Sequence, residues 1–164
     1  MDSWTLLWAM ILAFAPISEV RGAIPYLLIA TSGDAVGAVY GLLLSVAANM
    51  AVPFAAFPIL DVLDALAAKP WMPSVVKRLY GFLRGLGERK ALGVRRGSYI
   101  ALMVFVAVPL PATGAWTGSL VAYVLGLDRR KSILAIDAGV AAASLIVFAA
   151  AYLGIGLLKT LFML

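Results

Sequence analysis

The chain has 164 residues, of which 64% are hydrophobic and only 13% are charged, and its mean hydropathy is +1.04. A soluble domain is about half apolar and about a quarter charged, and a disordered chain is richer still in charge. Because the sequence has no cysteine and no histidine, disulfides, thiol catalysis and ordinary zinc or haem sites are excluded. The composition predicts one integral membrane domain, 1–164, without cofactors.

Lys and Arg are concentrated in two places and divide the chain into apolar blocks. Eight of the 13 lie between Lys69 and Arg96, and three form Arg129-Arg130-Lys131. Such clusters collect on the cytoplasmic side of membranes, so the net charge of +5 indicates cytoplasmic loops rather than nucleic-acid binding. The four apolar blocks are 4–31, 34–66, 98–126 and 132–158.

The second and fourth blocks, 34–66 and 132–158, are long enough to span a bilayer core of about 20 helical residues. We expect kinks in the second at Pro53 and Pro58. The first and third blocks each contain a polar break between prolines. The breaks are Pro16-Ile17-Ser18-Glu19-Val20-Arg21-Gly22-Ala23-Ile24-Pro25 and Pro109-Leu110-Pro111-Ala112-Thr113-Gly114-Ala115-Trp116.

Each broken block is either one interrupted span or a re-entrant hairpin that enters and leaves on one side. Basic clusters flank the block 98–126 on both sides, whereas the block 4–31 has no Lys or Arg at either flank. The positive-inside bias therefore favours two hairpins of opposite orientation. We expect an all-α inverted repeat, with 1–68 and 98–164 as the repeats and 69–97 as connector. Both termini are then outside, and 69–97 and 128–131 are cytoplasmic.

The connector 69–97 has an amphipathic and basic pattern. Apolar residues recur at helical spacing among the bases, namely Val75, Val76, Leu79, Phe82, Leu83 and Leu86. This pattern predicts an interfacial helix, either as a site for anionic lipid or as a plain topology anchor. The expected partners are thus membrane lipids and an unidentified substrate, and the small number of spans is compatible with a homodimer.

Glu19 and Arg21 are the clearest candidates for function, because charged side chains within the membrane are costly. They form either a structural ion pair, or an anion site at Arg21 beside a titrating Glu19. Broken helices of inverted repeats meet at the midplane of many transporters, so we expect the two breaks to form one site there. Further candidates are Ser18 and Thr113 as N-caps, Gly22 and Gly114 where a headgroup approaches the backbone, Asp137 and Asn49.

Each of these residues also has a structural explanation. Asp137 is a proton-relay candidate or a partner for Arg129 or Arg130, and Asn49 faces the pathway or bonds across helices. The glycines and prolines make turns in either case. The residues expected to shape the hairpins are Pro16, Pro25, Pro109, Pro111 and Trp116. No catalytic or metal site is expected, and an enzyme is not predicted.

The motifs Ser-Glu-Val-Arg-Gly-Ala-Ile-Pro (18–25) and Pro-Leu-Pro-Ala-Thr-Gly-Ala-Trp-Thr-Gly-Ser (109–119) resemble those of the small multi-drug export protein family, a distant relative of the DedA membrane proteins. The resemblance covers nearly the whole chain. It implies two opposed re-entrant hairpins and a transport role, and DedA relatives are linked to lipid flipping. Two departures are Ala112, where the family pattern has Gly, and the lack of an Arg at the second tip.

Three functions are therefore compatible with the sequence. The first is a transporter, proton-coupled through Glu19 and Asp137, that moves a small molecule or lipid across the cytoplasmic membrane. The second is a polyprenyl-phosphate or phospholipid translocase that uses Arg21 and the helix N-termini. The third is a membrane assembly factor that does not transport.

The predicted topology can be tested by single cysteines, since the chain has none of its own. In Gly33→Cys the thiol should react with a membrane-impermeant maleimide from outside, and in Asp128→Cys only from the cytoplasm. Labelling of both positions from the same side would contradict the inverted repeat.

Overall fold

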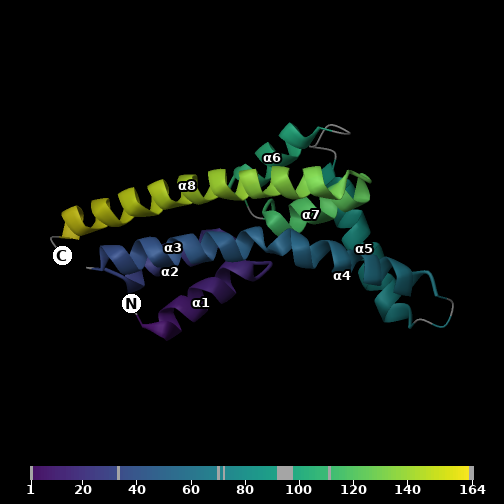
Figure 1. Ribbon diagram of the computed structural model, residues 1–164, viewed down its shortest axis with the longest axis horizontal. Coiled ribbons are helices and arrows are strands. Elements are labelled where there is room, and N and C mark those ends of the chain that lie inside the picture. The colour runs from purple at the N-terminus through teal and green to yellow at the C-terminus, as the bar shows by residue number, and fades with distance from the viewer. Residues whose placement is uncertain are drawn as a thin grey trace. The chain divides into compact units, whose positions relative to one another are not determined.

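The computed structural model describes residues 2–32, 34–69, 71, 73–91, 98–110 and 112–162. The described residues form helices and short connections without any strand (Figure 1). The helices are α1 (Ser3–Phe14), α2 (Glu19–Ala30), α3 (Ala35–Met50), α4 (Val52–Ala67), α5 (Ser74–Ala91), α6 (Tyr99–Ala107), α7 (Ala115–Val124) and α8 (Arg129–Phe162). The all-helical fold is thus confirmed. The chain divides into two compact units, 1–51 with 140–164, and 52–139.

In the first unit, α1 and α2 are joined by the turn 15–18, pack against each other, and both contact α3. Each of the two helices has 12 residues, which is about 18 Å of helix and a little over half of a bilayer core. The buried positions of α3 are Gly41, Ser45 and Asn49, one on each turn of one face. Small side chains on this face let the helices approach closely, which is the usual basis of helix packing in membranes.

In the second unit, α7 packs against α4, α5 and α6. Its residues 118–122 are all buried. Glycines allow the close contacts, because a Cβ at Gly118 would lie 2.6 Å from Val106 of α6, and one at Gly87 of α5 would lie 2.8 Å from Val124 of α7. The core of this unit therefore depends on backbones that approach at positions without side chains.

Two helical stretches are long and apolar enough to cross a membrane, Ala35–Ala67 and Arg129–Gly154. They coincide with the second and fourth predicted blocks. Ala51 interrupts the first stretch, between α3 and α4. Pro53 follows in the first turn of α4, where its missing N–H is tolerated, and Pro58 lies inside α4.

The first break is shorter than predicted. Only residues 15–18 leave the helix, whereas the segment from Glu19 to Pro25 is part of α2. A proline inside a helix costs about 3 kcal/mol, but α2 buries Val20, Ile24 and Leu27, and this packing outweighs the loss of one hydrogen bond. The second break lies where it was predicted, at 108–114, although Trp116 already belongs to α7. Pro111 lies outside the described residues.

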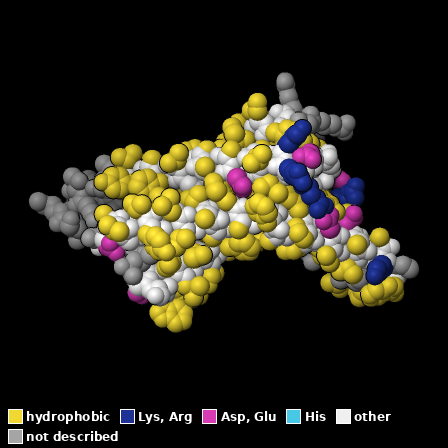
Figure 2. Space-filling model, viewed as in Figure 1, with side chains coloured by type: hydrophobic (Ala, Val, Ile, Leu, Met, Phe, Trp, Pro, Cys, Tyr) yellow, Lys and Arg dark blue, Asp and Glu magenta, His cyan; other side chains and the backbone are white. Residues whose placement is uncertain are grey.

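Apolar side chains cover most of the surface seen in Figure 2, while charged side chains gather over the part of the second unit where α8 begins. Exposed large hydrophobic residues include Ile17, Val36, Leu134 and Leu145, which come from both units. A soluble monomer rarely exposes apolar surface of this extent, so the outer faces are suited to contact with lipid.

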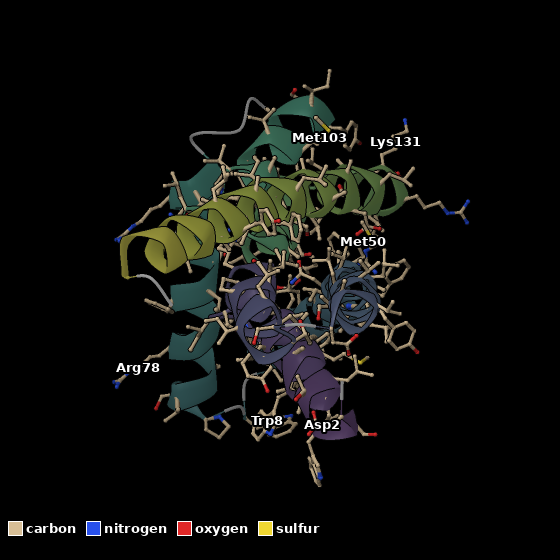
Figure 3. All side chains as sticks on the ribbon, turned by 90° about the vertical axis from the view of Figure 1, so that its left-hand side faces the viewer. Asp2, Trp8, Met50, Arg78, Met103 and Lys131 are labelled. Carbon is tan, nitrogen blue, oxygen red and sulfur yellow. The ribbon has the colours of Figure 1, made fainter. Side chains whose placement is uncertain are left out.

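Gly139→Ala should destabilise the protein. A Cβ at position 139 would lie 2.7 Å from the carbonyl oxygen of Met103 on α6, a residue labelled in Figure 3, and 2.7 Å from the Cβ of Val106. Because backbone is one of the obstacles, overpacking should cost about 1–3 kcal/mol, measured by thermal unfolding in detergent. The control is Gly154→Ala in the same helix, where a Cβ meets nothing within 4 Å. Equal stabilities of the two variants would contradict this prediction.

Candidate functional site

The turn between α1 and α2 is closed by a side-chain hydrogen bond. Pro16 has no N–H, so the carbonyl of Leu12, four residues earlier, lacks its helical donor. The hydroxyl of Ser18 donates to this carbonyl over 2.5 Å. An unsatisfied buried carbonyl would cost about 1–3 kcal/mol, so Ser18 stabilises the place at which the chain reverses.

The break between α6 and α7 is closed in the same way. The hydroxyl of Thr113 lies 2.7 Å from the carbonyl oxygen of Val108 and 2.8 Å from that of Leu110. Thr113 is buried. At both breaks, therefore, a hydroxyl that follows the turn bonds a carbonyl at or just beyond the end of the preceding helix.

This arrangement corrects the prediction that Ser18 and Thr113 cap the returning helices. Ser18 is at the N-cap of α2 but makes no capping bond with its side chain, and the N-cap of α7 is Gly114. Ser18 bonds the carbonyl that Pro16 leaves without a helical donor, whereas Thr113 bonds two carbonyls of the second break itself, those of Val108 and Leu110. At Gly22 a Cβ would lie 2.8 Å from the Cβ of Ser18, so the turn itself requires a glycine there, and the approach of a headgroup to its backbone stays a prediction.

Glu19 and Arg21 lie side by side at the start of α2. A carboxylate oxygen of Glu19 is 4.0 Å from a guanidinium nitrogen of Arg21, and their side chains are 7% and 21% exposed, respectively. Glu19 also has φ of +49°, a left-handed conformation that costs a non-glycine residue about 1–3 kcal/mol. A strained and buried acidic residue beside an arginine is typical of a functional position, and an ion pair links the two residues.

Asn49 lies beside this turn. Its side-chain N–H₂ donates to the carbonyl of Ala13 in the last turn of α1, over 2.5 Å, and it is fully buried. Its side-chain oxygen and the hydroxyl of Ser45 are buried and have no hydrogen-bond partner among the described residues. Asn49 thus bonds across helices, and it ties α3 to the end of α1.

Asp137 belongs to the second unit, in the membrane-length part of α8. Its Oδ1 is buried and has no hydrogen-bond partner in the described part of the chain. The predicted partner Arg129 instead pairs with Asp61 of α4 and lies 5.7 Å from the centre of the Phe57 ring. Sequence reasoning missed this pair because Asp61 lies 68 residues before Arg129. Only the packing of α4 near the start of α8 brings them together.

Ala112 lies in the second break with a φ of +60°, in the left-handed region that glycine adopts without strain. An alanine therefore meets this backbone requirement at a cost in strain.

The candidate residues are thus divided between the two units. Ser18, Glu19, Arg21, Gly22 and Asn49 lie around the α1–α2 turn, whereas Thr113, Gly114 and Asp137 lie in the second unit. That the two breaks form one site stays a prediction. Among the residues described, no group of three His, Cys, Asp or Glu side chains could hold a metal ion.

Comparison with protein families identifies the chain. The model of the family described as "putative small multi-drug export protein" matches residues 19–146, from the start of α2 into α8. The chain belongs to this family. The matched segment includes the candidate residues Glu19, Arg21 and Asn49, and also Thr113 and Gly114 of the second break. Together with the two long apolar helices, the match indicates a membrane protein of an export family. No curated protein and no solved structure is similar enough to the chain to match it.

Ser18→Ala should lower the stability of the α1–α2 turn by about 1–3 kcal/mol, because the Leu12 carbonyl loses its donor. Thermal unfolding in detergent measures the loss. Ser32→Ala, at an exposed position outside the helices, should be neutral. If both variants unfold at the parent's temperature, the hydroxyl does not close the turn.

Proposed function

We propose that this small multi-drug export protein is a proton-coupled transporter of lipophilic cations, not an enzyme, and that Asp137 carries the coupling proton. The observation that carries the proposal is the buried Oδ1 of Asp137, which has no hydrogen-bond partner among the described residues. An ionised carboxylate within an apolar span costs several kcal/mol. Either a proton or a cationic substrate can remove that cost.

Competition between these two ligands provides the coupling. A cation that binds beside Asp137 stabilises the ionised form and releases a proton, and by reciprocity a bound proton weakens binding of the cation. Exchange of a cation for a proton at one carboxylate couples export to a proton gradient when the site opens alternately to the two sides of the membrane. The family's description as a multi-drug export protein supports the class of substrate.

Glu19 has a different role in this proposal. It lies 4.0 Å from Arg21, so its charge is balanced within the chain, and protonation would leave the guanidinium without that counter-charge. We propose that the Glu19–Arg21 pair holds the α1–α2 turn in its strained conformation. The group that binds and releases the coupling proton is then Asp137.

The membrane arrangement that we propose follows from the two broken helix pairs. α1 with α2, and α6 with α7, are each too short to span singly and would enter as re-entrant hairpins of opposite orientation. The protein would reside in the cytoplasmic membrane with both termini outside. Translocation of polyprenyl phosphates or phospholipids is the second candidate, because Arg21 retains 21% side-chain exposure beside the turn and could bind a phosphate.

The test is uptake of tetraphenylphosphonium into proteoliposomes that contain the purified protein, with an imposed pH gradient. Asp137→Asn should abolish gradient-driven uptake. In detergent, binding of tetraphenylphosphonium by the parent should weaken as the pH falls, whereas binding by Asp137→Asn should not depend on pH. Glu88→Gln, which alters an exposed acid of α5, is the matched control and should behave as the parent.

The alternatives predict other results. Transfer of a fluorescent phosphatidylglycerol between leaflets that is lost in Arg21→Ala would favour the lipid translocase. If uptake keeps its pH dependence in Asp137→Asn but loses it in Glu19→Gln, the residue that carries the coupling proton is Glu19 and not Asp137. A folded protein that transports neither probe would favour the assembly factor.

A further inference from the structure

Helix α5 has one face fixed to the second unit and one face without a partner in the described structure. Gly87 and Ala91 are buried on the inner face, and the helix packs against α4 and α7. On the outer face, Val75 and Phe82 are 71% and 68% exposed. They lie seven residues apart, so two turns of helix place them on the same side.

Two arginines lie along the same side of the helix. Arg78 precedes Phe82 by four residues and Arg89 follows it by seven, and both are exposed. The side chain of Arg78 extends away from the helices in Figure 3. We refer to Val75, Arg78, Phe82 and Arg89 as the outer face of α5. Immediately before the helix, Trp71 is 69% exposed, and the Lys69 ammonium lies 5.5 Å from the centre of its ring.

A polar network on the other flank holds the helix in this orientation. The hydroxyls of Tyr80 on α5 and Tyr123 on α7 donate to the two oxygens of Asp64 on α4, over 2.5 and 3.4 Å. The hydrogen bond to Asp64 raises the pKa of Tyr80 above its ordinary value, so the hydroxyl keeps its proton at neutral pH. α5 is thus attached to two neighbouring helices, which leaves its outer face turned outward.

The pocket of about 270 Å³ beside this network is not suited to an anion. Asp64 lines it, and the guanidinium of Arg84 is already shared between Tyr80 and Glu88. Among the exposed bases of α5, Arg78 and Arg89 lie on the outer face, and Lys77 is exposed as well. An apolar ridge flanked by arginines is complementary to the headgroup layer of a bilayer, into which Val and Phe side chains insert while the arginines meet phosphates.

We propose that the outer face of α5 binds the anionic phospholipid surface of the membrane in which the protein resides. The helix carries five bases, Lys77, Arg78, Arg84, Arg89 and Lys90, against the single acid Glu88, so the charge favours anionic over zwitterionic lipid. This inference does not depend on the transported substrate, and its failure would leave the proposed transport untouched.

The experiment uses the full chain with one introduced cysteine. Phe82→Cys is labelled with the environment-sensitive dye NBD and placed in nanodiscs of phosphatidylcholine, with or without one-third phosphatidylglycerol. In discs with phosphatidylglycerol, the label should be quenched by nitroxide-bearing lipids and protected from acrylamide. The control is a label at Gly81→Cys, the adjacent position, where a Cβ meets nothing within 4 Å. It should stay accessible to acrylamide in both discs.

The arginines are then tested in the labelled protein. Arg78→Gln with Arg89→Gln should lower the ratio of inserted to free helix by about 25-fold, since each charge contributes about fivefold at an anionic surface. Replacing both by Lys should restore insertion. High salt should release α5 from the membrane surface in the protein that carries only the label at position 82. This test needs no further substitution, so its result does not depend on whether another variant folds.

Three results would overturn the proposal. A label at position 82 that stays in water in both discs would mean that the outer face does not bind lipid and is free for a protein partner. Equal insertion in both discs would remove the role of anionic lipid. Failure of the lysine pair to restore insertion would assign the loss to packing instead of charge.

Discussion

The structure depends on one constraint, that a carbonyl released from a helix in an apolar environment must find another donor. Pro16 removes the helical donor of the Leu12 carbonyl, and the ends of α1 and α6 leave further carbonyls beyond regular helical bonding. In the first unit, Ser18 and Asn49 supply donors to Leu12 and Ala13 at the end of α1. In the second, Thr113 supplies one to Val108. The polar residues of the breaks thus have a structural role, because they supply hydrogen-bond donors to carbonyls at the ends of the helices.

Close packing of the helices follows from small residues. Small residues occupy closely packed positions in both units, namely Gly41 and Ser45 on α3, Gly118 on α7 and Gly139 on α8. Helices in lipid gain little from burying apolar surface, so van der Waals contact between backbones supplies much of their association. The carboxylate of Asp137, two residues before Gly139, has a buried oxygen without a hydrogen-bond partner among the described residues.

Charged residues outside the two breaks organise the second unit. Asp61 binds Arg129 and Asp64 binds Tyr80, so two acids one turn apart on α4 attach the start of α8 and the inner side of α5. Figure 3 shows Arg78 extending away from the helices, whereas the Lys131 ammonium lies 6.0 Å from the centre of the Tyr99 ring of α6. The basic side chains divide into those that hold helices together and those that face outward, and only the latter are available to lipid.

The sequence by itself determined the all-helical class, the two membrane-length helices and the approximate place of both breaks, because composition, block length and proline are local properties. It also identified Glu19 and Arg21, since charges within an apolar block are conspicuous. It did not determine the length of the first break, where the packing of Val20, Ile24 and Leu27 keeps Pro25 within α2. Nor did it determine the partners of Ser18, Thr113, Asn49 and Arg129. A side chain's hydrogen-bond partner depends on which helices lie adjacent, and tertiary packing alone decided that.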